Sequence, residues 1–281
     1  MSETYHVVAR EELTGPVQPI ARAIATATGE VAFDVTREIR GKIGVLASGL
    51  TKDQAARLVG SLSQVSVRVF ALAESSVVKF PDPVFLETAR LGNDALEVSD
   101  LRDKDGRPIG QVNAPYADIA FIATALVKTT TEKRVTEIDT GGYGPVVGEH
   151  PYGVLGFMGD LARQRTRQSD PADHVPEVRI ERQSQYGHFL DIFAVEPAHH
   201  LRLNASTFNF IQTGLEMQAT SIANLTRFIK HFAVHCSRAQ IDPSIRHILD
   251  GSPHTNLKLG SPAQYDAYLS WRIQLLYHPE E

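Results

Sequence analysis

Two hydrophobic periods alternate along the first 76 residues. At 66–71 Val67, Val69 and Ala71 alternate with Arg68, which is the period of a half-buried strand, and residues 5–10 are a short strand candidate. Ile20 and Ile24, and later Leu58 and Leu62, recur at helical spacing instead. The pattern predicts strands at 5–10, 43–47 and 66–71, and helices after Pro16, over 33–40 and after Thr51.

The predicted helices carry residues typical of helix ends. Thr14 supplies a hydroxyl ahead of Pro16, and proline is favoured in a first helical turn. Gly29 suits a helix end, because glycine adopts the left-handed conformation without steric cost. Thr51 is placed to cap the third helix.

The order of these elements resembles a known small domain. Thr28 and Gly29 lie between the first two helices, and residues 49–53 (Gly-Leu-Thr-Lys-Asp) precede the third. This spacing resembles the C-terminal domain of the bacterial ribosomal stalk protein, whose fold is shared with the Clp-protease adaptor. The resemblance implies an adaptor-like α/β domain over residues 1–78 that acts as a docking surface and catalyses nothing.

The functional residues of those families are not matched here. Stalk domains dock translation factors on basic residues of the first two helices, and Arg22 is the one such position still basic. The adaptor recognises peptide N-termini with acidic and histidine groups, whereas this segment has no histidine after His6. The other positions that correspond to the stalk's basic residues hold Val17, Ala25, Phe33 and Thr36.

Three arginines of this domain are candidates for contact with another protein. Arg22 lies in the first predicted helix, and Arg37 and Arg40 lie in the second. The alternative is that they form a solvated helix face, since long cationic side chains commonly cover surface in this way.

The pattern of apolar runs and turn residues in the rest of the chain predicts a mainly antiparallel β domain over residues 84–281. Pro81 and Pro83 interrupt the chain and mark the boundary. Helices are expected from Ser221, after Pro243 and from Ser261, and a sheet closed by helices resembles a pleckstrin-homology-like (PH-like) arrangement. The whole chain is thus expected to be α+β. Predicted strands occupy 84–91, 95–98, 108–112, 116–138, 178–186, 189–195 and 200–203, with a turn at Gly187.

A long loop rich in glycine is predicted at 139–177. It lacks the Gly-Lys-Ser/Thr ending of a phosphate-binding loop. We expect it to bind a partner through exposed apolar and basic residues, or alternatively to pack on its own domain. The partner-binding candidates in it are Tyr143, Phe157, Met158, Arg163, Arg165 and Arg167.

Two histidines have the spacing of metal ligands, but the sequence does not supply a complete metal-binding motif around them. His231 and His235 are one helical turn apart, as in zinc-binding pairs, but Arg227 and Arg238 on the same face would oppose a cation. Further ligands by residue type are Cys236, His199, His200 and His247. We expect no metal, no cofactor and no catalytic set, with Cys236 as a core residue.

Composition restricts the possible partners. With a net charge of −5 and a pI of about 6.1, the chain has no global positive field, which disfavours nucleic-acid binding. The single cysteine permits no internal disulfide, and residues 1–10 do not have the pattern of a signal peptide. The apolar run at 119–127 is too short to cross a membrane as a helix. A cytoplasmic protein is expected.

Three functional hypotheses follow. The leading one is a non-enzymatic cytoplasmic adaptor or scaffold that binds another protein. The second is an enzyme or small-ligand-binding protein with a site under the 139–177 loop, using Tyr143, His150, His188 or Arg202. The third is a self-assembling homo-oligomer.

Overall fold

A computed structural model describes residues 3–40, 42–102, 107–137, 177–196, 198–251 and 257–280. The chain divides into two compact units, one formed by Met1–Thr129 with Gln185–Glu281 and the other by Thr130–Ser184. Helices and strands both contribute substantially, so the predicted α+β class is confirmed. The candidate loop residues Tyr143, Phe157, Met158, Arg163, Arg165 and Arg167 lie outside the described residues, as does His150.

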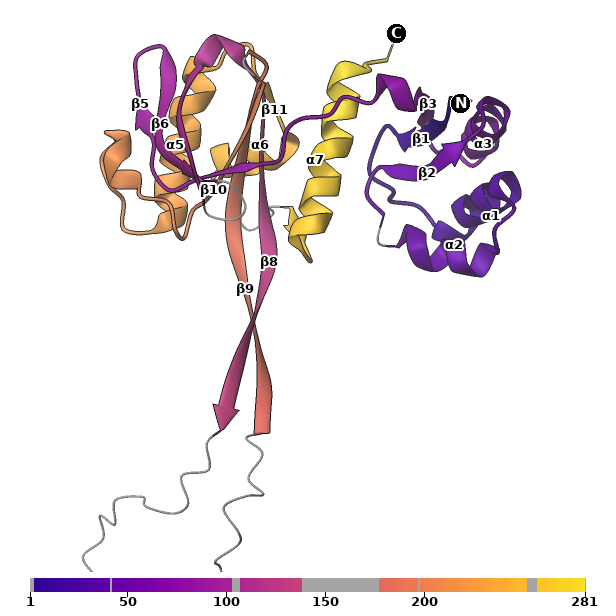
Figure 1. The fold of residues 1–281 in the computed structure, drawn as a ribbon. Coiled ribbons are helices and arrows are strands. Elements are labelled where there is room, and N and C mark those ends of the chain that lie inside the picture. The colour runs from indigo at the N-terminus through magenta and orange to yellow at the C-terminus, as the bar shows by residue number, and fades with distance from the viewer. Residues whose placement is uncertain are drawn as a thin grey trace, which may run out of the picture. The chain divides into compact units, whose positions relative to one another are not determined.

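A three-stranded sheet begins the fold. Its central strand is β1 (Tyr5–Ala9), which pairs antiparallel with β2 (Val45–Leu50) and with β3 (Val69–Ala73) (Figure 1). The helices between these strands are α1 (Val17–Thr28), α2 (Ala32–Ile39) and α3 (Lys52–Gln64). The element order predicted for this region is therefore confirmed.

Local side-chain chemistry explains two of the helix ends. Gly29 follows α1 with φ 80°, in the left-handed region that favours glycine. Thr51 and Gln54 form a capping box at the start of α3, each side chain bonding the other residue's backbone N–H. The cap predicted at Thr14 is wrong, because Pro16 is the N-cap of α1 and no side chain bonds to that end.

The small sheet is covered on both faces. Val7 and Ala9 pack with α1, α2 and α3, as the alternation of a strand requires. Val8 and Leu72 belong instead to a cluster that includes Trp271 of α7 (Pro262–Tyr277). A helix from the last twenty residues of the chain therefore closes the face that the N-terminal helices leave open.

The larger sheet has nine strands among the described residues. Its order is β11-β8-β9-β10-β4-β6-β5, with β12 beside β8 and β7 beside β6. The pairs β10·β4, β11·β8 and β12·β8 are parallel, so the sheet is less regularly antiparallel than predicted. The strands are β4 (Val84–Leu86), β5 (Arg90–Leu91), β6 (Ala95–Arg102), β7 (Pro108–Pro115), β8 (Ile119–Glu137), β9 (Glu177–Ala194), β10 (His199–Asn204), β11 (Gln240–Ile241) and β12 (Lys258–Leu259).

The turn predicted at Gly187 does not exist. β9 continues through it, and a Cβ built on Gly187 would lie 3.2 Å from the Asn204 side chain and from the Phe189 ring. Glycine is present there because neighbouring groups approach the strand closely, not because the chain reverses.

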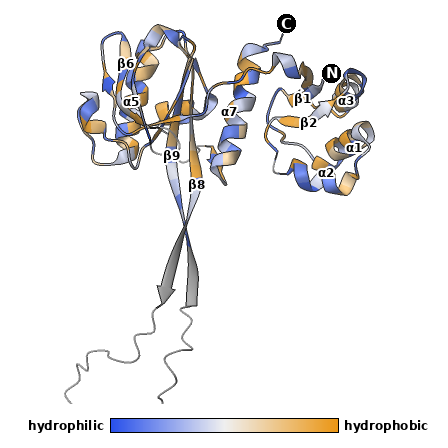
Figure 2. Cartoon of the chain, in the orientation of Figure 1, coloured by the Kyte–Doolittle hydropathy of each residue, from blue (hydrophilic) through white to orange (hydrophobic). Residues whose placement is uncertain are grey.

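Helices α5 (Ser221–His235) and α6 (Pro243–Leu249) pack on the larger sheet through Leu225, Phe232 and Ile245. Apolar residues concentrate on the strands and on the inner sides of the helices (Figure 2). Across the described ranges, no helix is both long enough and apolar enough to cross a membrane.

Candidate functional site

Two arginines face each other across the small sheet. Ala9 of β1 pairs with Val69 of β3, and the next backbone N–H, that of Arg10, donates to the Arg68 carbonyl at 2.8 Å. Like charges directly opposite on neighbouring strands repel. An anion between the two guanidinium groups would relieve this repulsion.

Arg10 is held firmly at the base of the site. Its guanidinium carbon lies 4.0 Å from the centre of the Phe70 ring, and its Nη1 donates to the His278 carbonyl at 2.5 Å. Only 18% of the side chain is exposed. Stacking and hydrogen bonding together fix the direction in which its remaining N–H groups point.

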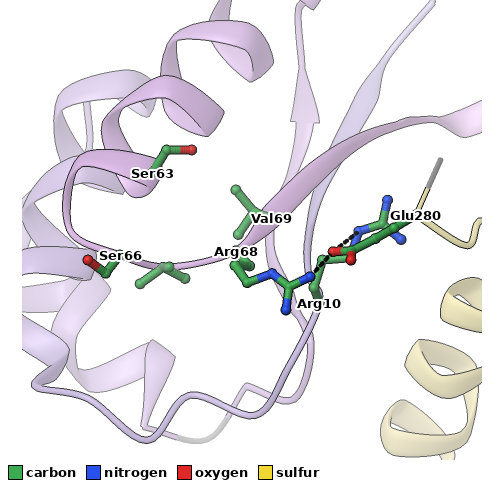
Figure 3. Close-up of a pocket in the computed structure, with 7 residues that line it drawn as sticks. Arg10, Ser63, Ser66, Arg68, Val69 and Glu280 are labelled. Carbon is green, nitrogen blue, oxygen red and sulfur yellow. Dashed lines mark hydrogen bonds and ion pairs between the residues drawn. The ribbon is translucent and has the colours of Figure 1, made fainter.

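Arg68 shares one carboxylate with Arg10. Its Nη2 donates to Oε1 of Glu280, and the same oxygen lies 3.9 Å from Arg10 Nε (Figure 3). The side chains of Arg68 and Glu280 are 59% and 53% exposed, so this carboxylate is held at the surface. Glu280 thus marks the position at which an anion sits in this site.

The surrounding pocket is open and has a volume of about 680 Å³. We call it the Arg10–Arg68 pocket. Ser63 at the end of α3 and Ser66 in the following turn lie on one side of it, and Val67 and Val69 add apolar surface (Figure 3). Ser66 has φ 60°, a left-handed conformation that is uncommon for a residue other than glycine. It turns the chain sharply between α3 and β3.

Binding is the chemistry that this pocket supports. Guanidinium groups recognise carboxylate and phosphate oxygens through charge-assisted hydrogen bonds. The Ser63 hydroxyl already donates to the Val59 carbonyl at 2.9 Å, and no histidine or cysteine lines the pocket among the described residues.

The predicted arginines lie elsewhere. Arg22, Arg37 and Arg40 are all exposed on α1 and the α2 end, as expected for either a docking face or a solvated one. None of them lines the Arg10–Arg68 pocket. Arg40 lines a second, mainly apolar pocket.

The histidine pair is brought together as the helical spacing predicts. The rings of His231 and His235 lie 4.2 Å apart, and Tyr116 stacks on His235 at 5.3 Å. Burial, with the neighbouring His235, lowers the pKa of His231, whose Nε2 is buried without a hydrogen-bond partner in the described structure. Within those same residues, no three His, Cys, Asp or Glu side chains gather as metal ligands.

Cys236 directly follows α5 and is 1% exposed. Burial raises the pKa of its thiol to about 12, which disfavours the thiolate that a nucleophile needs. It therefore packs as a small core residue, away from the exposed His247.

Arg202 belongs to a buried ionic cluster. Its Nε donates to Asp191 at 2.7 Å and its Nη2 to Asp266 at 2.7 Å, while His200 Nε2 lies 2.5 Å from the same Asp191 oxygen. Burial opposes the Arg202 charge, but Asp191, Tyr265 and Asp266 together outweigh it and raise the pKa of Arg202. Arg202 is 3% exposed and already pairs with two carboxylates, so its side chain is largely closed to solvent.

His188 is likewise a partly buried residue of β9. Burial lowers the pKa of His188, and its Nδ1 is buried without a hydrogen-bond partner among the described residues. Neither His188 nor Arg202 lines the Arg10–Arg68 pocket.

The Arg10–Arg68 pocket was not anticipated by sequence motifs. Its ion pair joins residues 212 positions apart, and only the pairing of β1 with β3 places the two arginines opposite each other. The available signal was a basic residue in the first and the last predicted strand, Arg10 at the end of 5–10 and Arg68 within 66–71. No protein-family model, curated protein or solved structure matches this chain.

Proposed function

We propose that this chain is a non-enzymatic protein-interaction module that docks an acidic segment of another protein in the Arg10–Arg68 pocket. One observation carries the proposal. Two arginines stand opposite each other, and among the described residues the carboxylate that both approach is the exposed Glu280. A partner's Asp or Glu side chain offers the same chemistry to the same two groups.

Glu280 is weakly held, so that it can be displaced. Exposed ion pairs contribute about 0.2–1 kcal/mol, because water screens the charges and both side chains lose freedom. A partner segment with several carboxylates competes with it at a modest cost. The apolar surface of Val67 and Val69 adds contact area beside the charges.

The finer architecture is part of the same proposal. The N-terminal strands and helices have the order of the adaptor-like fold, which serves as a docking surface in the families it resembles. The larger sheet with its helices would provide a PH-like support. We place the protein in the cytoplasm, where its single cysteine stays reduced.

Peptide binding tests the proposal. A fluorescein-labelled peptide of alternating Glu and Ser is titrated with the full chain and followed by fluorescence anisotropy, beside the same peptide with Gln in place of Glu. We expect the Glu peptide to bind more tightly. Arg68→Gln should weaken that binding about threefold or more, as expected for a lost exposed charge contact. Glu280→Gln should strengthen it, because the internal competitor is removed.

Arg57→Gln is the matched control. Arg57 is also exposed and lies on α3, but it does not line the pocket. Arg57→Gln removes the same charge from the same part of the protein. The affinity of this variant for the Glu peptide should equal that of the wild type within error. Equal binding of the Glu and Gln peptides, or equal effects of the Arg68 and Arg57 variants, would contradict the proposal.

Self-assembly is a second candidate, favoured by one apolar surface. Val31 and Phe33 at the start of α2 are 64% and 76% exposed, which is unusual for neighbouring large apolar residues. Light scattering over a range of protein concentrations tests it. Phe33→Ser should abolish a concentration-dependent rise in mass, whereas Val234→Ser, at a position 75% exposed, should not. A constant monomer mass for the wild type rejects self-assembly.

A further inference from the structure

A second pocket of about 360 Å³ opens beside α7. We call it the apolar groove. Its walls include Ile39, Leu259 and Trp271, and charged residues stand at its rim. It shares no lining residue with the Arg10–Arg68 pocket. What it binds is therefore independent of the function proposed above.

The apolar surface that solvent reaches in the groove comes from four half-buried residues, whereas Trp271 and Tyr268 in the same lining are 1% and 4% exposed. The four are Leu13, Val17, Ile43 and Leu257. Trp271 Nε1–H donates to the Ala9 carbonyl at 2.6 Å, and the Tyr268 hydroxyl donates to Asp242 at 2.9 Å. Asp242 is 0% exposed and also accepts a bond from Arg272 at 2.8 Å. Trp271 and Tyr268 therefore hold their N–H and O–H donors inside the protein, and the groove keeps an apolar lining beside them.

The rim has an excess of positive charge. Arg40 and Lys42 line it together with one carboxylate, Glu12. Lys42 Nζ pairs with Glu38 at 3.2 Å, whereas Arg40 makes no ion pair within the described part of the chain. An unpaired, exposed guanidinium above an apolar wall is suited to the charged end of an amphipathic anion.

We propose that the apolar groove binds a small amphipathic carboxylate, with its aliphatic or aromatic body against the half-buried Leu13, Val17 and Ile43 and its carboxylate on Arg40. The volume lies near the lower end of the range for small-molecule pockets, about 300–1,000 Å³. The predominantly apolar lining with a few polar groups at the opening is also the usual composition of such sites.

Trp271 can report on this binding, because it is the chain's single tryptophan and belongs to the groove lining. The full protein is titrated with decanoate while its intrinsic fluorescence is recorded. We expect a saturable change in intensity or wavelength. Acetate, which lacks the apolar body, should produce no such change. Decylammonium, which carries the opposite charge, should bind at least about fivefold more weakly than decanoate.

Arg40→Gln and Arg37→Gln form a matched pair of variants. Both arginines are exposed near the end of α2, but only Arg40 lines the groove, so both proteins should fold alike. Decanoate affinity should fall about fivefold in Arg40→Gln and stay unchanged in Arg37→Gln. Absence of a saturable signal, equal binding of decylammonium, or equal effects of the two variants would each overturn the proposal.

Discussion

Gly44 packs directly against the indole ring of Trp271. A Cβ built on Gly44 would overlap Trp271 Cγ at well under 3.0 Å, a separation that real Cβ atoms do not show. The residue also has φ 73°, in the left-handed region. Gly44 directly precedes β2 and Trp271 lies in α7. The contact therefore packs α7 against the small N-terminal sheet.

Gly44→Ala should therefore destabilise the protein severely. The left-handed conformation alone costs about 1–2 kcal/mol for a residue with a Cβ, and overpacking a buried site adds about 1–3 kcal/mol. Gly49→Ala is the control, because Gly49 has φ 70° but nothing within 4 Å of its Cβ position. Urea unfolding of both variants separates the two costs, and equal losses of stability would show that the Trp271 contact does not matter.

Asp191 should be far more important to stability than Asp266, although both bind Arg202. Asp191 is fully buried and serves His200 as well, whereas the Asp266 side chain is 53% exposed. Removing one partner of a buried pair costs about 3–5 kcal/mol, because the other charge stays buried. An exposed pair contributes about 0–1 kcal/mol. Thermal unfolding of Asp191→Asn and Asp266→Asn measures the difference, and similar melting temperatures would refute this ranking.

Stability should fall at alkaline pH because of Cys236. The pKa of the buried thiol is raised from 9.0 to about 12. Above pH 9 the unfolded chain loses this proton while the folded chain keeps it, so unfolding becomes easier as pH rises toward 12. The slope is at most about 1.4 kcal/mol per pH unit, because a single thiol contributes at most one proton to the difference between the two states.

Cys236→Ala isolates this contribution. Urea unfolding of the wild type and the variant at pH 8 and pH 10 should show a larger loss of stability in the wild type. The alanine variant keeps the effect of burial on the tyrosines, which is the largest cause that raises the pKa of Tyr116 to about 12, and removes only the smaller effect of the Cys236 charge on Tyr116. The same alkaline loss in both proteins would mean that Cys236 does not titrate as argued.

Elements determined by nearby residues could be predicted from the sequence. Thr51 caps α3 because its partner Gln54 is three residues away, and Gly29 ends α1 through its own backbone conformation. Ser261 and Pro262 begin α7 for the same reason, since the Ser261 side chain accepts from the Gln264 N–H. In each case the residues that determine the helix end lie within a few positions of one another in the sequence.

Features that depend on distant partners could not be predicted. Gly187 suggested a turn, but its role depends on the approach of Asn204 on the neighbouring strand. Arg10 and Arg68 lie opposite each other because of the register of β1 with β3. Helical and strand periods in the sequence do not reveal that register. Trp271 was likewise missed, because its importance lies in the sheet face that it covers.

The same covered face tests whether residues 1–78 form an independent domain. Val8 and Leu72 are 1% and 4% exposed in the full chain, where they share a cluster with Trp271. Without α7 these side chains would face water, at about 25 cal/mol for each Å² of apolar surface exposed. We therefore expect a fragment of residues 1–78 to bind a hydrophobic dye and to self-associate in light scattering.

A peptide of residues 257–280 should then displace the dye and restore a single mass, because it supplies the missing cover. The same peptide with Trp271→Ala should displace it much less, since it lacks both the indole and the hydrogen bond to the Ala9 carbonyl. A fragment that stays monomeric and takes up no dye would instead establish residues 1–78 as self-sufficient. In that event α7 would be an accessory to a domain that is complete without it.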